Sequence, residues 1–577
     1  MISFQMNKKQ IQKLIALIVV TALFFGLLYL TRPATVMDTG EPPESLITEQ
    51  ERNNGTGGDT EERVLLISDM LAEIERQNQI EEMLLTELNS GIYDFNNPLV
   101  VVNPYGMSPL TALVLFTSSE PMNISVHIPG KSELADIDFT FEGYNTVHEI
   151  PIYGLYPDEL NTIELIAITQ GGGSEYVTLD ITTDPLPPEL EKNIILADLV
   201  QPDKYQPGFN YSFVQKCAFD VNGDYRWFFN DFGLLQACLY NYNGNTIFSK
   251  GSYHEGDVLL FEANALGKII SVYYSQYGVH HDISDIDNKN LLVTGSHGDT
   301  VEDFIYEIDV ESGEIVNVLD LKYSLQRTRT SGHSDYNTVD WFHNNAIIYD
   351  NESIIISGAR QSAVIKLSWP EGVIEWILSA PVGWDPIFSK YLLTPINGNF
   401  EWSYAQHSPE ILPNFDNSTD TVDILLFDNG ISRFSNDREL QRAISNNEVA
   451  NPELYSRMVH YRINEGTKTV EQIWQFGEEL GETFFSHSRG DANLLGNGNR
   501  LGTFDRFHQG TGDNYNTSFI EVDPSGNIVW DVYCSTLDAA SSFNAYRCER
   551  LPLYTEAAND LQIGVPARVL IPEELLP

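Results

Sequence analysis

The feature that most constrains the fold is an internal repeat of one strand–turn–strand unit. Each unit runs from an apolar strand through a turn that contains glycine into a second strand with an aromatic or apolar end. The turn glycines lie about 44 to 60 residues apart, with one interval of about 94, and four-stranded units at such spacing are typical of β-propellers. We therefore predict an all-β chain whose main domain, over 191–577, is a six-bladed β-propeller. The units cover residues 219–229, 261–274, 306–321, 365–378, 461–474 and 520–534.

The region ahead of the repeat predicts two further elements. Short β-rich runs separated by Gly, Pro, Asn and Asp indicate a small immunoglobulin-like β-sandwich over 95–186. Apolar residues at helical spacing predict an amphipathic helix over 62–91, which either packs on its own chain or pairs with a second copy. Within the long interval of the repeat, residues 435–449 also have a helix-like pattern.

The N-terminus predicts export. An apolar run over 14–30 follows three lysines, and its length is just sufficient to span a hydrocarbon core. We therefore expect residues 1–34 to form a signal-anchor transmembrane helix whose N-terminus is cytoplasmic. The polar, Gly- and acid-rich stretch 35–61 then forms a flexible stalk. The remaining chain would be extracytoplasmic and anchored to the cell membrane by this helix.

Four cysteines fit that location. They fall into two sequence-local pairs, and disulfides Cys217–Cys238 and Cys534–Cys548 are the favoured one of three connectivities.

Net charge restricts the partners. At pH 7 it is −49, which argues against a nucleic acid. An anion bound here must be attracted by a few local cations that work against the field of the whole protein.

Four histidines, His281, His343, His407 and His487, each begin a hairpin-like segment in the second half of the chain. In a propeller the first strand of each blade lines the central channel, so histidines at its beginning lie at one mouth of that channel. Repetition at equivalent positions favours a functional site over four unrelated structural histidines.

Hairpin pairing brings cations to the same mouth. When 343–360 folds about the turn at 350–352, paired residues sum to about 703, so His343 lies opposite Arg360. The same folding pairs His281 with His297 and His487 with Arg506.

Two kinds of ligand suit such a ring. Converging imidazoles can hold a transition metal, but metal sites recruit carboxylates, and here an arginine takes such a position. Histidine, arginine and the amide of Asn345 suit a tetrahedral oxyanion better, because the arginine fork matches the oxygens of sulfate or phosphate.

The sequence blocks around these histidines resemble a known family. The segments Asp340-Trp-Phe-His-Asn-Asn345, Tyr349-Asp350, Ser357-Gly-Ala-Arg360 and Ile365-Lys366 are similar to the signature of bacterial arylsulfate sulfotransferases. His280-His281-Asp282-Ile283 and Gln406-His407 also match motifs of that family. The resemblance extends over roughly residues 95 to 550 and includes a β-sandwich ahead of a six-bladed propeller.

The resemblance implies a sulfuryl transfer that uses no nucleotide donor and no cofactor or metal. A phenolic sulfate ester donates its sulfuryl group to a histidine, and another phenol then accepts it in a ping-pong reaction. By motif position His407 is the nucleophile that becomes a sulfohistidine, and His281, His343, Arg360 and Asn345 surround the sulfate. The other side of the channel has candidate substrate-binding residues in His487 and Thr503. The partners are then phenols and phenolic sulfate esters, and the resemblance is compatible with a homodimer.

Two alternatives remain open. One is a metal-dependent propeller enzyme, a lyase or hydrolase. The other is a surface-tethered binding propeller that catalyses no reaction.

Overall fold

The computed structural model describes residues 60–230, 236–287, 289–327, 329, 339–416, 418–431, 433, 454–507, 515–537 and 542–577. The predicted transmembrane segment, the stalk and the helix-like stretch 435–449 lie outside the described residues. Within the described ranges, none of the helices is both long and apolar enough to cross a membrane.

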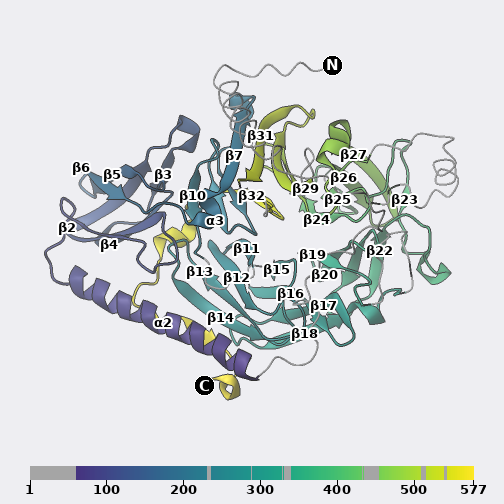
Figure 1. Ribbon diagram of the computed structural model, residues 1–577, viewed down its shortest axis with the longest axis horizontal. Coiled ribbons are helices and arrows are strands. Elements are labelled where there is room, and N and C mark those ends of the chain that lie inside the picture. The colour runs from purple at the N-terminus through teal and green to yellow at the C-terminus, as the bar shows by residue number, and fades with distance from the viewer. Residues whose placement is uncertain are drawn as a thin grey trace, which may run out of the picture. The chain divides into compact units, whose positions relative to one another are not determined.

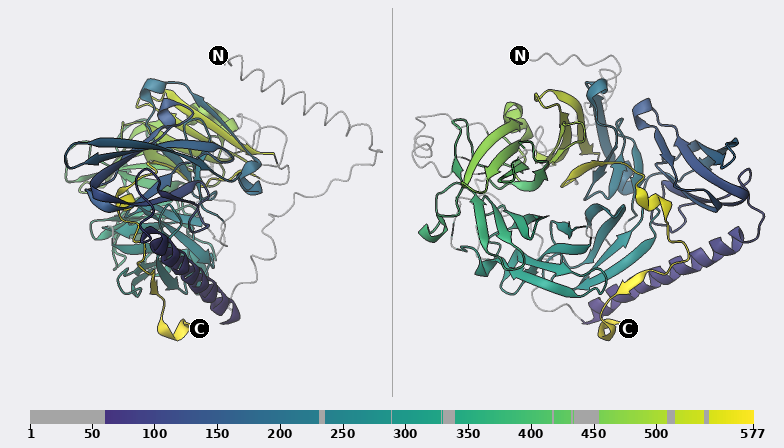
Figure 2. Two further views of the ribbon diagram at one scale, coloured as in Figure 1. Left: turned by 90° about the vertical axis from the view of Figure 1, so that its left-hand side faces the viewer. Right: turned by 180° about the vertical axis from the view of Figure 1, so that it is seen from behind.

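One long helix, α2 (Thr60–Leu88), precedes the first sheet. It packs on its own chain, and its buried side chains include Ile67, Met70 and Leu84. Two polar residues anchor it: the Gln77 amide donates to the Gly267 carbonyl at 3.0 Å, and Glu81 pairs with Lys268 at 2.7 Å. Figures 1 and 2 show α2 running beside the C-terminal segment, where the Gly564 amide donates to Glu81 at 2.8 Å.

The first sheet contains six strands joined through the long strand β2. The first half of β2 pairs with β1 and β4, and its second half pairs with β3 and β5. Since β2 changes partners along its length, one strand connects two groups of strands, as the predicted β-sandwich requires. The strands are β1 (Leu99–Val102), β2 (Thr111–Ile128), β3 (Ile137–Thr140), β4 (Asn145–Tyr153), β5 (Leu160–Thr169) and β6 (Ser174–Thr182).

Over the described residues the rest of the chain forms six sheets of four or five strands. The first three contain β8 (Phe209–Ser212), β9 (Cys217–Phe219), β10 (Tyr225–Phe228) and β32 (Cys548–Leu551); β11 (Gln236–Tyr242), β12 (Asn245–Gly251), β13 (Val258–Ala263), β14 (Ile269–Ser275) and β33 (Arg568–Leu570); and β15 (Ile283–Ile286), β16 (Asn290–His297), β17 (Thr300–Ile308) and β18 (Ile315–Asp320).

The other three sheets continue the series. They contain β19 (Asn344–Asp350), β20 (Ser353–Gly358), β21 (Ala363–Ser368) and β22 (Ile374–Leu378); β23 (Thr394–Pro395), β24 (His407–Leu412), β25 (Thr421–Asp428), β26 (Arg457–Asn464) and β27 (Thr469–Phe476); and β28 (Asp491–Leu494), β29 (Arg500–Phe507), β30 (Asn516–Val522), β31 (Ile528–Thr536) and β7 (Asn193–Leu199).

Short helices connect these strands. They are α3 (Pro188–Glu191), η1 (Glu133–Ala135), η2 (Pro202–Lys204), η3 (Leu321–Tyr323), η4 (Pro386–Phe388), η5 (Glu478–Phe484), η6 (Glu556–Asn559) and η7 (Glu573–Leu575).

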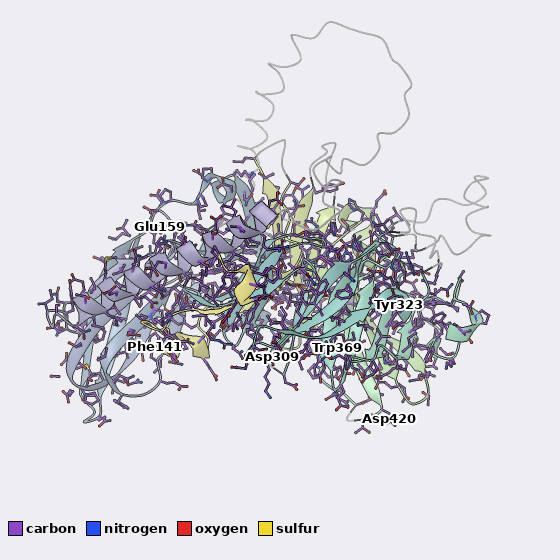
Figure 3. The ribbon with its side chains drawn as sticks, turned by 90° about the horizontal axis from the view of Figure 1, so that it is seen from below. Phe141, Glu159, Asp309, Tyr323, Trp369 and Asp420 are labelled. Atoms are coloured by element: carbon purple, nitrogen blue, oxygen red, sulfur yellow. The ribbon has the colours of Figure 1, made fainter. Side chains whose placement is uncertain are left out.

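The predicted repeat is confirmed as the last hairpin of each of these six sheets. For example, a turn glycine lies between β9 and β10 in the first of these six sheets and between β30 and β31 in the sixth of them. Gly267 and Gly313, for example, have φ of +91° and +75°, which glycine adopts at little cost. Asp309 and Trp369, which are labelled in Figure 3, belong to two of these turns.

The first strands of neighbouring sheets lie side by side. Strand β15 contacts β19, and β19 contacts β24 (Figure 1). Strand β24 in turn contacts β28. Two strand pairs join segments that are far apart in the sequence: β32 pairs with β8, and β7 pairs with β31. Closure of the six sheets into a propeller stays a prediction.

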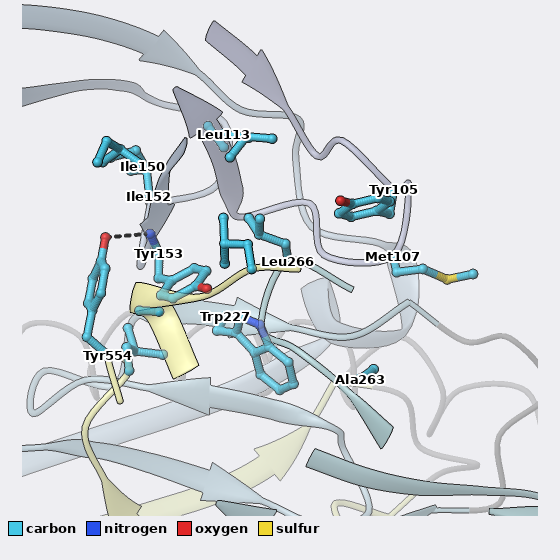
Figure 4. Packing of buried hydrophobic residues seen from close by; sticks show 14 of the residues in the cluster. Tyr105, Met107, Leu113, Ile150, Ile152, Tyr153, Trp227, Ala263, Leu266 and Tyr554 are labelled. Atoms are coloured by element: carbon cyan, nitrogen blue, oxygen red, sulfur yellow. Dashed lines mark hydrogen bonds between the residues drawn. The ribbon is translucent and has the colours of Figure 1, made fainter. Parts of the chain in front are cut away.

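One cluster of buried hydrophobic residues contains side chains from the six-stranded sheet β1–β6 and from strands β8 to β14. Trp227, Tyr153 and Tyr554 are all buried in it. The Tyr153 amide donates to the Tyr554 hydroxyl at 3.0 Å, and the Trp227 indole donates to the Ala265 carbonyl at 2.9 Å (Figure 4). The Tyr554 hydroxyl and the Trp227 indole nitrogen are therefore hydrogen-bonded inside the core.

The predicted disulfides are wrong. Cys217, Cys534 and Cys548 are free, buried thiols in one apolar cluster. Burial raises the pKa of the Cys217 thiol well above its usual value, which keeps it protonated and unreactive. Within each predicted pair the two cysteines belong to strands of different sheets: β9 and β11 for Cys217 and Cys238, and β31 and β32 for Cys534 and Cys548.

Candidate active site

In several of the six sheets the first strand is preceded by a residue in the left-handed backbone conformation. The φ angles are +52° at His281 before β15, +58° at His343 before β19, +65° at Arg489 before β28 and +65° at Tyr546 before β32. Non-glycine residues rarely have such angles, and strain of this kind gathers at functional sites. The repeat therefore provides one special backbone position for each of these sheets, and its residue type differs between them.

In the sixth sheet this position belongs to Arg489 and not to His487. Strand β28 begins only at Asp491, which lies opposite Thr503, so the predicted pairing of His487 with Arg506 is wrong. The His487 ring instead lies edge-on to Tyr515 at a centroid distance of 5.1 Å.

The predicted register of the fourth sheet is confirmed. Ile347 lies opposite Ile356, and the two numbers sum to 703. The Ala359 amide donates to the His343 carbonyl at 3.1 Å. Arg360 and His343 thus lie at the same end of the hairpin.

The predicted register of the third sheet is wrong by two residues. Ile283 lies opposite Val293, while His297 pairs with Thr300 in the next hairpin. The His297 side chain is about half exposed and pairs with Glu255 at 3.0 Å.

His343 is held by two carboxylates. Its Nδ1 atom forms a short ion pair with Glu302 Oε2 and lies 3.1 Å from Asp340 Oδ2. Burial alone would lower the pKa of His343, but the negative charges of Glu302 and Asp340 outweigh it and raise this pKa to about 10. At neutral pH the ring is an imidazolium.

His281 has a different set of partners. Its Nε2 atom lies 3.3 Å from Glu302 Oε2, and its Nδ1 atom lies 2.9 Å from the Tyr546 hydroxyl and 3.3 Å from the Tyr253 hydroxyl. Burial lowers its pKa, and the charge of Glu302 offsets only part of that shift. The His281 ring is therefore neutral although its centroid lies 4.7 Å from that of His343.

Among the described residues, the contacts of His407 Nδ1 are with two carbonyl oxygens. This atom lies 2.7 Å from Asn429 Oδ1 and 3.1 Å from the Ala405 carbonyl. The orientation of the Asn429 amide is fixed, because its nitrogen donates to the carbonyls of Ser486 at 2.9 Å and Arg489 at 2.5 Å. Nδ1 must then carry the proton, and the lone pair of the ring lies on Nε2.

The backbone around His407 is also strained, since Ala405 and Ser408 have φ of +51° and +46°. His407 itself is 5% exposed. Burial lowers its pKa well below the usual value, so the imidazole is neutral.

A buried ion pair forms the floor of the site. Arg547 donates to Asp282 at 2.5 Å and to the Asn345 carbonyl at 2.8 Å. The Asn345 amide nitrogen in turn donates to the carbonyl of Gln406, the residue before His407, at 2.8 Å. This chain of contacts connects the beginnings of four first strands, β32, β15, β19 and β24, and fixes the position of His407.

Two more predicted residues, Arg360 and Thr503, and the unpredicted Arg489 complete the description of this region. Arg360 contacts Asp340 Oδ2 at 3.0 Å and so adds a cation beside the His343 carboxylates. The Arg489 guanidinium lies 5.7 Å from the centre of the Tyr546 ring. Thr503 is buried, and among the described residues its hydroxyl has no hydrogen-bond partner.

The structure brings carboxylates to histidines where the sequence indicated mainly arginine. One candidate metal-ligand group results, with ligand atoms of His281, Glu302 and His343 within 4.8 Å of one another. Two imidazoles and a carboxylate form a suitable donor set for a transition metal. The Arg360 guanidinium beside Asp340 favours an anion at the same place.

The same first strands continue into a cavity of about 600 Å³. Its lining includes Glu410, Asp491 and Glu549. Burial raises the pKa of both Glu410 and Glu549 to about 8. Ser408 and Arg547 also line this acidic cavity, and in the sequence they directly follow His407 and Tyr546 of the site.

Sequence reasoning missed Arg489, Tyr546, Arg547, Glu302 and Asn429. Arg489 and Tyr546 could have been found, because each stands two residues before a first strand, as His281 does before β15. Glu302 lies on the third strand of its sheet and Asn429 follows a second strand, where the repeat gives no signal.

Two protein-family models match this chain. The model described as Arylsulfotransferase (ASST) matches residues 193–547, and the model described as Arylsulfotransferase Ig-like domain matches residues 99–184. Among solved structures, a putative 6-phosphogluconolactonase from Bacteroides uniformis aligns over 75% of this chain and 98% of that chain at 10% identity, but its TM-score of 0.28 supports no structural argument.

Two curated relatives agree with the family models. The arylsulfate sulfotransferase AssT of Lelliottia amnigena is 23% identical over 511 residues, which covers 67% of this chain and 81% of the relative. The enzyme of the same name from Escherichia coli O6:H1 (strain CFT073) is 25% identical over 514 residues, with the same coverage of both chains. Because one family model alone matches more than half of the residues, this chain belongs to the arylsulfotransferase family.

Proposed function

We propose that this protein transfers a sulfuryl group from a phenolic sulfate ester to a second phenol by a ping-pong reaction through a sulfohistidine at His407. We further propose that the six sheets close into a six-bladed propeller, with the site at the beginning of its first strands. The observation that carries the proposal is the pair of carbonyl oxygens in contact with Nδ1 of His407. Its Nδ1 proton is held by two carbonyl oxygens, which leaves Nε2 as a neutral nucleophile.

In the first half-reaction Nε2 of His407 attacks the sulfur of the ester. The N–S bond forms as the S–O bond to the aryl oxygen breaks, and the departing phenolate takes a proton from an acid in the site or from water. The charged sulfohistidine is stabilised by the carbonyl contacts of Nδ1–H. In this step the proton for the phenolate comes from water, because His281 is a neutral imidazole, hydrogen-bonded to two tyrosine hydroxyls. His281 instead acts as the base that accepts the proton of the second phenol and passes it back to solvent.

The second half-reaction reverses these events with another phenol. The phenol oxygen attacks sulfur, its proton passes to the base, and the N–S bond breaks. His407 returns to the neutral form in which Nδ1 is protonated. No net proton is gained or lost over the full cycle.

Cations of the site hold the sulfuryl oxygens. The transition state of such a transfer carries dispersed charge, by the same logic as phosphoryl transfer. The His343 imidazolium and the Arg360 guanidinium supply fixed positive charge, an effect on the order of a few kcal/mol for each donor. We assign Asn345 to positioning of His407, because its amide nitrogen donates to the Gln406 carbonyl. The prediction that Asn345 also binds the sulfate stays a prediction. Thr503 and His487 are retained as candidate contacts of the aryl group.

The test uses 4-nitrophenyl sulfate as donor. Donor without acceptor is added to the full chain, and intact-mass analysis is expected to find one sulfuryl group that maps to His407. The variant His407→Ala should lose both this mass and transfer to an added phenol. The half-exposed His297, which pairs with Glu255 outside the site, provides the matched control His297→Ala. Transfer at the wild-type rate by His407→Ala would refute the proposal.

A metal-dependent reaction is the second candidate, because His281, Glu302 and His343 could hold a transition metal. Stoichiometric metal on the purified protein, together with loss of activity after chelation, would favour it. Ligand binding without turnover on a broad panel of sulfate esters and phenols would instead favour a binding protein.

We also propose that the enzyme is extracytoplasmic and anchored by the apolar run over 14–30. Its support is the three lysines ahead of that run. The free thiols Cys217, Cys534 and Cys548 remove the additional support that disulfides would have given. Protease accessibility of the large domain in intact cells tests the location.

A further inference from the structure

Arg489 occupies the backbone position that places two histidines in the site. Its φ is +65°, and the φ angles of His281 and His343 are +52° and +58°. Arg489 and His281 each stand two residues before the first strand of their sheets, β28 and β15. Because a non-glycine residue rarely holds such a conformation, the repeat directs a guanidinium to the same end of the first strands as the two imidazoles.

The backbone of Arg489 is hydrogen-bonded to the group that orients the proposed nucleophile. The Asn429 side chain donates to the Arg489 carbonyl at 2.5 Å, and its oxygen lies 2.7 Å from His407 Nδ1. Strand β24, which begins at His407, contacts both β19 and β28. The nucleophile therefore stands between two sheets that each supply a cation, with His343 and Arg360 on one side and Arg489 on the other.

The Arg489 guanidinium has hydrogen-bonding capacity to spare. Its Cζ atom lies 5.7 Å from the centre of the Tyr546 ring. Among the described residues, its Nη1 atom is buried without a hydrogen-bond partner, and its ion pair with Asp505 Oδ2 is long, at 3.9 Å. Asp505 Oδ2 itself accepts from the Tyr546 amide at 3.0 Å. A buried donor without an acceptor is costly, so a ligand oxygen at Nη1 would complete the site.

Transfer of the sulfuryl group leaves a negative charge on the aryl oxygen. As the S–O bond breaks, its electron pair moves onto this oxygen, which lies across sulfur from His407 Nε2 in an in-line transfer. The sulfuryl oxygens are assigned to His343 and Arg360, and the aryl group to Thr503. Since Thr503 lies on β29, in the sheet that begins with β28, the aryl oxygen would lie on the side of Arg489.

We propose that Arg489 is a catalytic residue whose Nη1 atom donates a hydrogen bond to the aryl oxygen as the phenolate departs, and that this contact lets the enzyme use sulfate esters of weakly acidic phenols. The inference rests on the proposed sulfuryl transfer through His407. The guanidinium keeps its own protons, and water protonates the phenolate after its release. In the second half-reaction the same atom holds the oxygen of the attacking phenol, and the steps run in reverse.

The test compares two donors whose leaving phenols differ in acidity, 4-nitrophenyl sulfate and phenyl sulfate. The variant Arg489→Met removes the charge and keeps a long unbranched side chain. We expect its rate of His407 sulfation, followed by intact mass, to fall about 10-fold with 4-nitrophenyl sulfate and about 1000-fold with phenyl sulfate, because the poorer leaving group depends more on a cation at its oxygen. A loss of folded protein lowers both rates by the same factor and cancels in their ratio.

A second variant and a matched control accompany this comparison. Arg489→Lys keeps the charge, so its ratio of the two rates should lie between those of the wild type and Arg489→Met. The control is Arg462→Met. The Arg462 side chain is 24% exposed, against 28% for Arg489, and pairs with Asp423 at the end of β25 remote from His407. This change should alter both rates less than about twofold.

A further measurement needs no turnover. The visible absorbance of 4-nitrophenol, a product of the first half-reaction, reports its ionisation when it is bound to the full chain. A cation at the phenol oxygen favours the phenolate, so 4-nitrophenol should have a lower pKa when bound to the wild type than when bound to Arg489→Met.

Equal factors for the two donors in Arg489→Met would overturn the inference, because a contact with a sulfuryl oxygen or with no part of the substrate would not distinguish the leaving groups. An equal pKa of 4-nitrophenol bound to the wild type and to Arg489→Met would overturn it as well. If the wild-type chain is itself never sulfated, the proposed function fails instead, and the titration of bound 4-nitrophenol still decides whether Arg489 faces a phenol oxygen.

Discussion

The surroundings of His343 and of His407 differ in one chemical respect. Both rings stand at the beginning of a first strand, and both are largely withdrawn from water. The acceptors around His343 are the charged oxygens of Glu302 and Asp340, whereas those around His407 are neutral carbonyl oxygens of Asn429 and Ala405. A carboxylate partner fixes a permanent cation, and a carbonyl partner fixes only a tautomer. In the proposed mechanism the same residue type therefore serves as an anion ligand at one position and as the nucleophile at the other.

The strongest way to break this contrast is Asn429→Asp, which gives His407 a carboxylate like those of His343. The negative charge should raise the pKa of His407, so that the ring becomes protonated and cannot attack sulfur. We expect the sulfation rate at pH 6 to fall about 1000-fold and to recover as pH rises, because deprotonation restores the nucleophile. The measurement is the burst of 4-nitrophenol as a function of pH.

The control for that variant is Asn397→Asp, because Asn397 donates to the Gln472 carbonyl at a distance from the histidines. A burst in Asn429→Asp that is independent of pH would remove the tautomer argument.

The variant Asp340→Asn tests the same difference at His343, because it removes one of the two carboxylates that contact this histidine. His343 would keep only Glu302, and Arg360 would lose its partner at 3.0 Å. We expect the transfer rate at pH 8 to fall about 10- to 100-fold, and the high-pH loss of activity to begin below about pH 10. Steady-state kinetics against pH measure both effects.

Asp299→Asn is the comparison for Asp340→Asn, since Asp299 pairs with Lys322 at the exposed surface. Equal effects of the two changes would mean that general electrostatics, and not the pair at His343, control the rate.

A smaller effect is expected from Asn345→Ala. This variant removes the hydrogen bond to the Gln406 carbonyl but leaves every charge of the site in place. If Asn345 only positions His407, kcat should fall about 10-fold while KM for the donor changes little. A large rise in KM with unchanged kcat would instead make Asn345 a direct ligand of the sulfate.

The smallest effect on activity is expected further along the same strands, from Glu549→Gln in the acidic cavity. Folding raises the pKa of Glu549 from 4.5 to about 8, so the folded state binds its proton more tightly than the unfolded chain. This contribution to stability is complete below about pH 4.5 and is lost as pH rises to about 8.

The glutamine side chain of this variant cannot ionise, so the variant should be more stable than the wild type at pH 9 by about 1 to 3 kcal/mol and nearly unchanged at pH 4. Urea unfolding at both pH values measures this, with the exposed Glu556→Gln as control. Equal stability of wild type and Glu549→Gln at pH 9 would contradict the expectation.

The regular parts of the fold were predictable from local signals. Gly267 and Gly313 mark tight turns that glycine permits, and the Asp350–Asn351 turn fixed the register that puts His343 beside Arg360. A turn centre placed one residue too late was enough to shift the register at His281 by two residues.

The polar surroundings of the histidines were not predictable in the same way. Glu302 and Asn429 reach the site from other strands, and their importance depends on side-chain contacts that no periodicity encodes. The cysteine prediction failed for a related reason, since thiols at packing positions have the same sequence pattern as those in disulfides.

The pairing of β32 with β8 has a consequence for the order in which the enzyme matures. Arg550 meets Asn210 across 340 residues of chain, and Tyr546 and Arg547 belong to the same late segment. A chain that emerges from the ribosome N-terminus first must therefore hold β8 with an unpaired edge until almost the whole polypeptide is available. The enzyme can therefore become active only after almost the whole chain has been synthesised. A shorter chain lacks both the strand that covers this edge and the floor of the site.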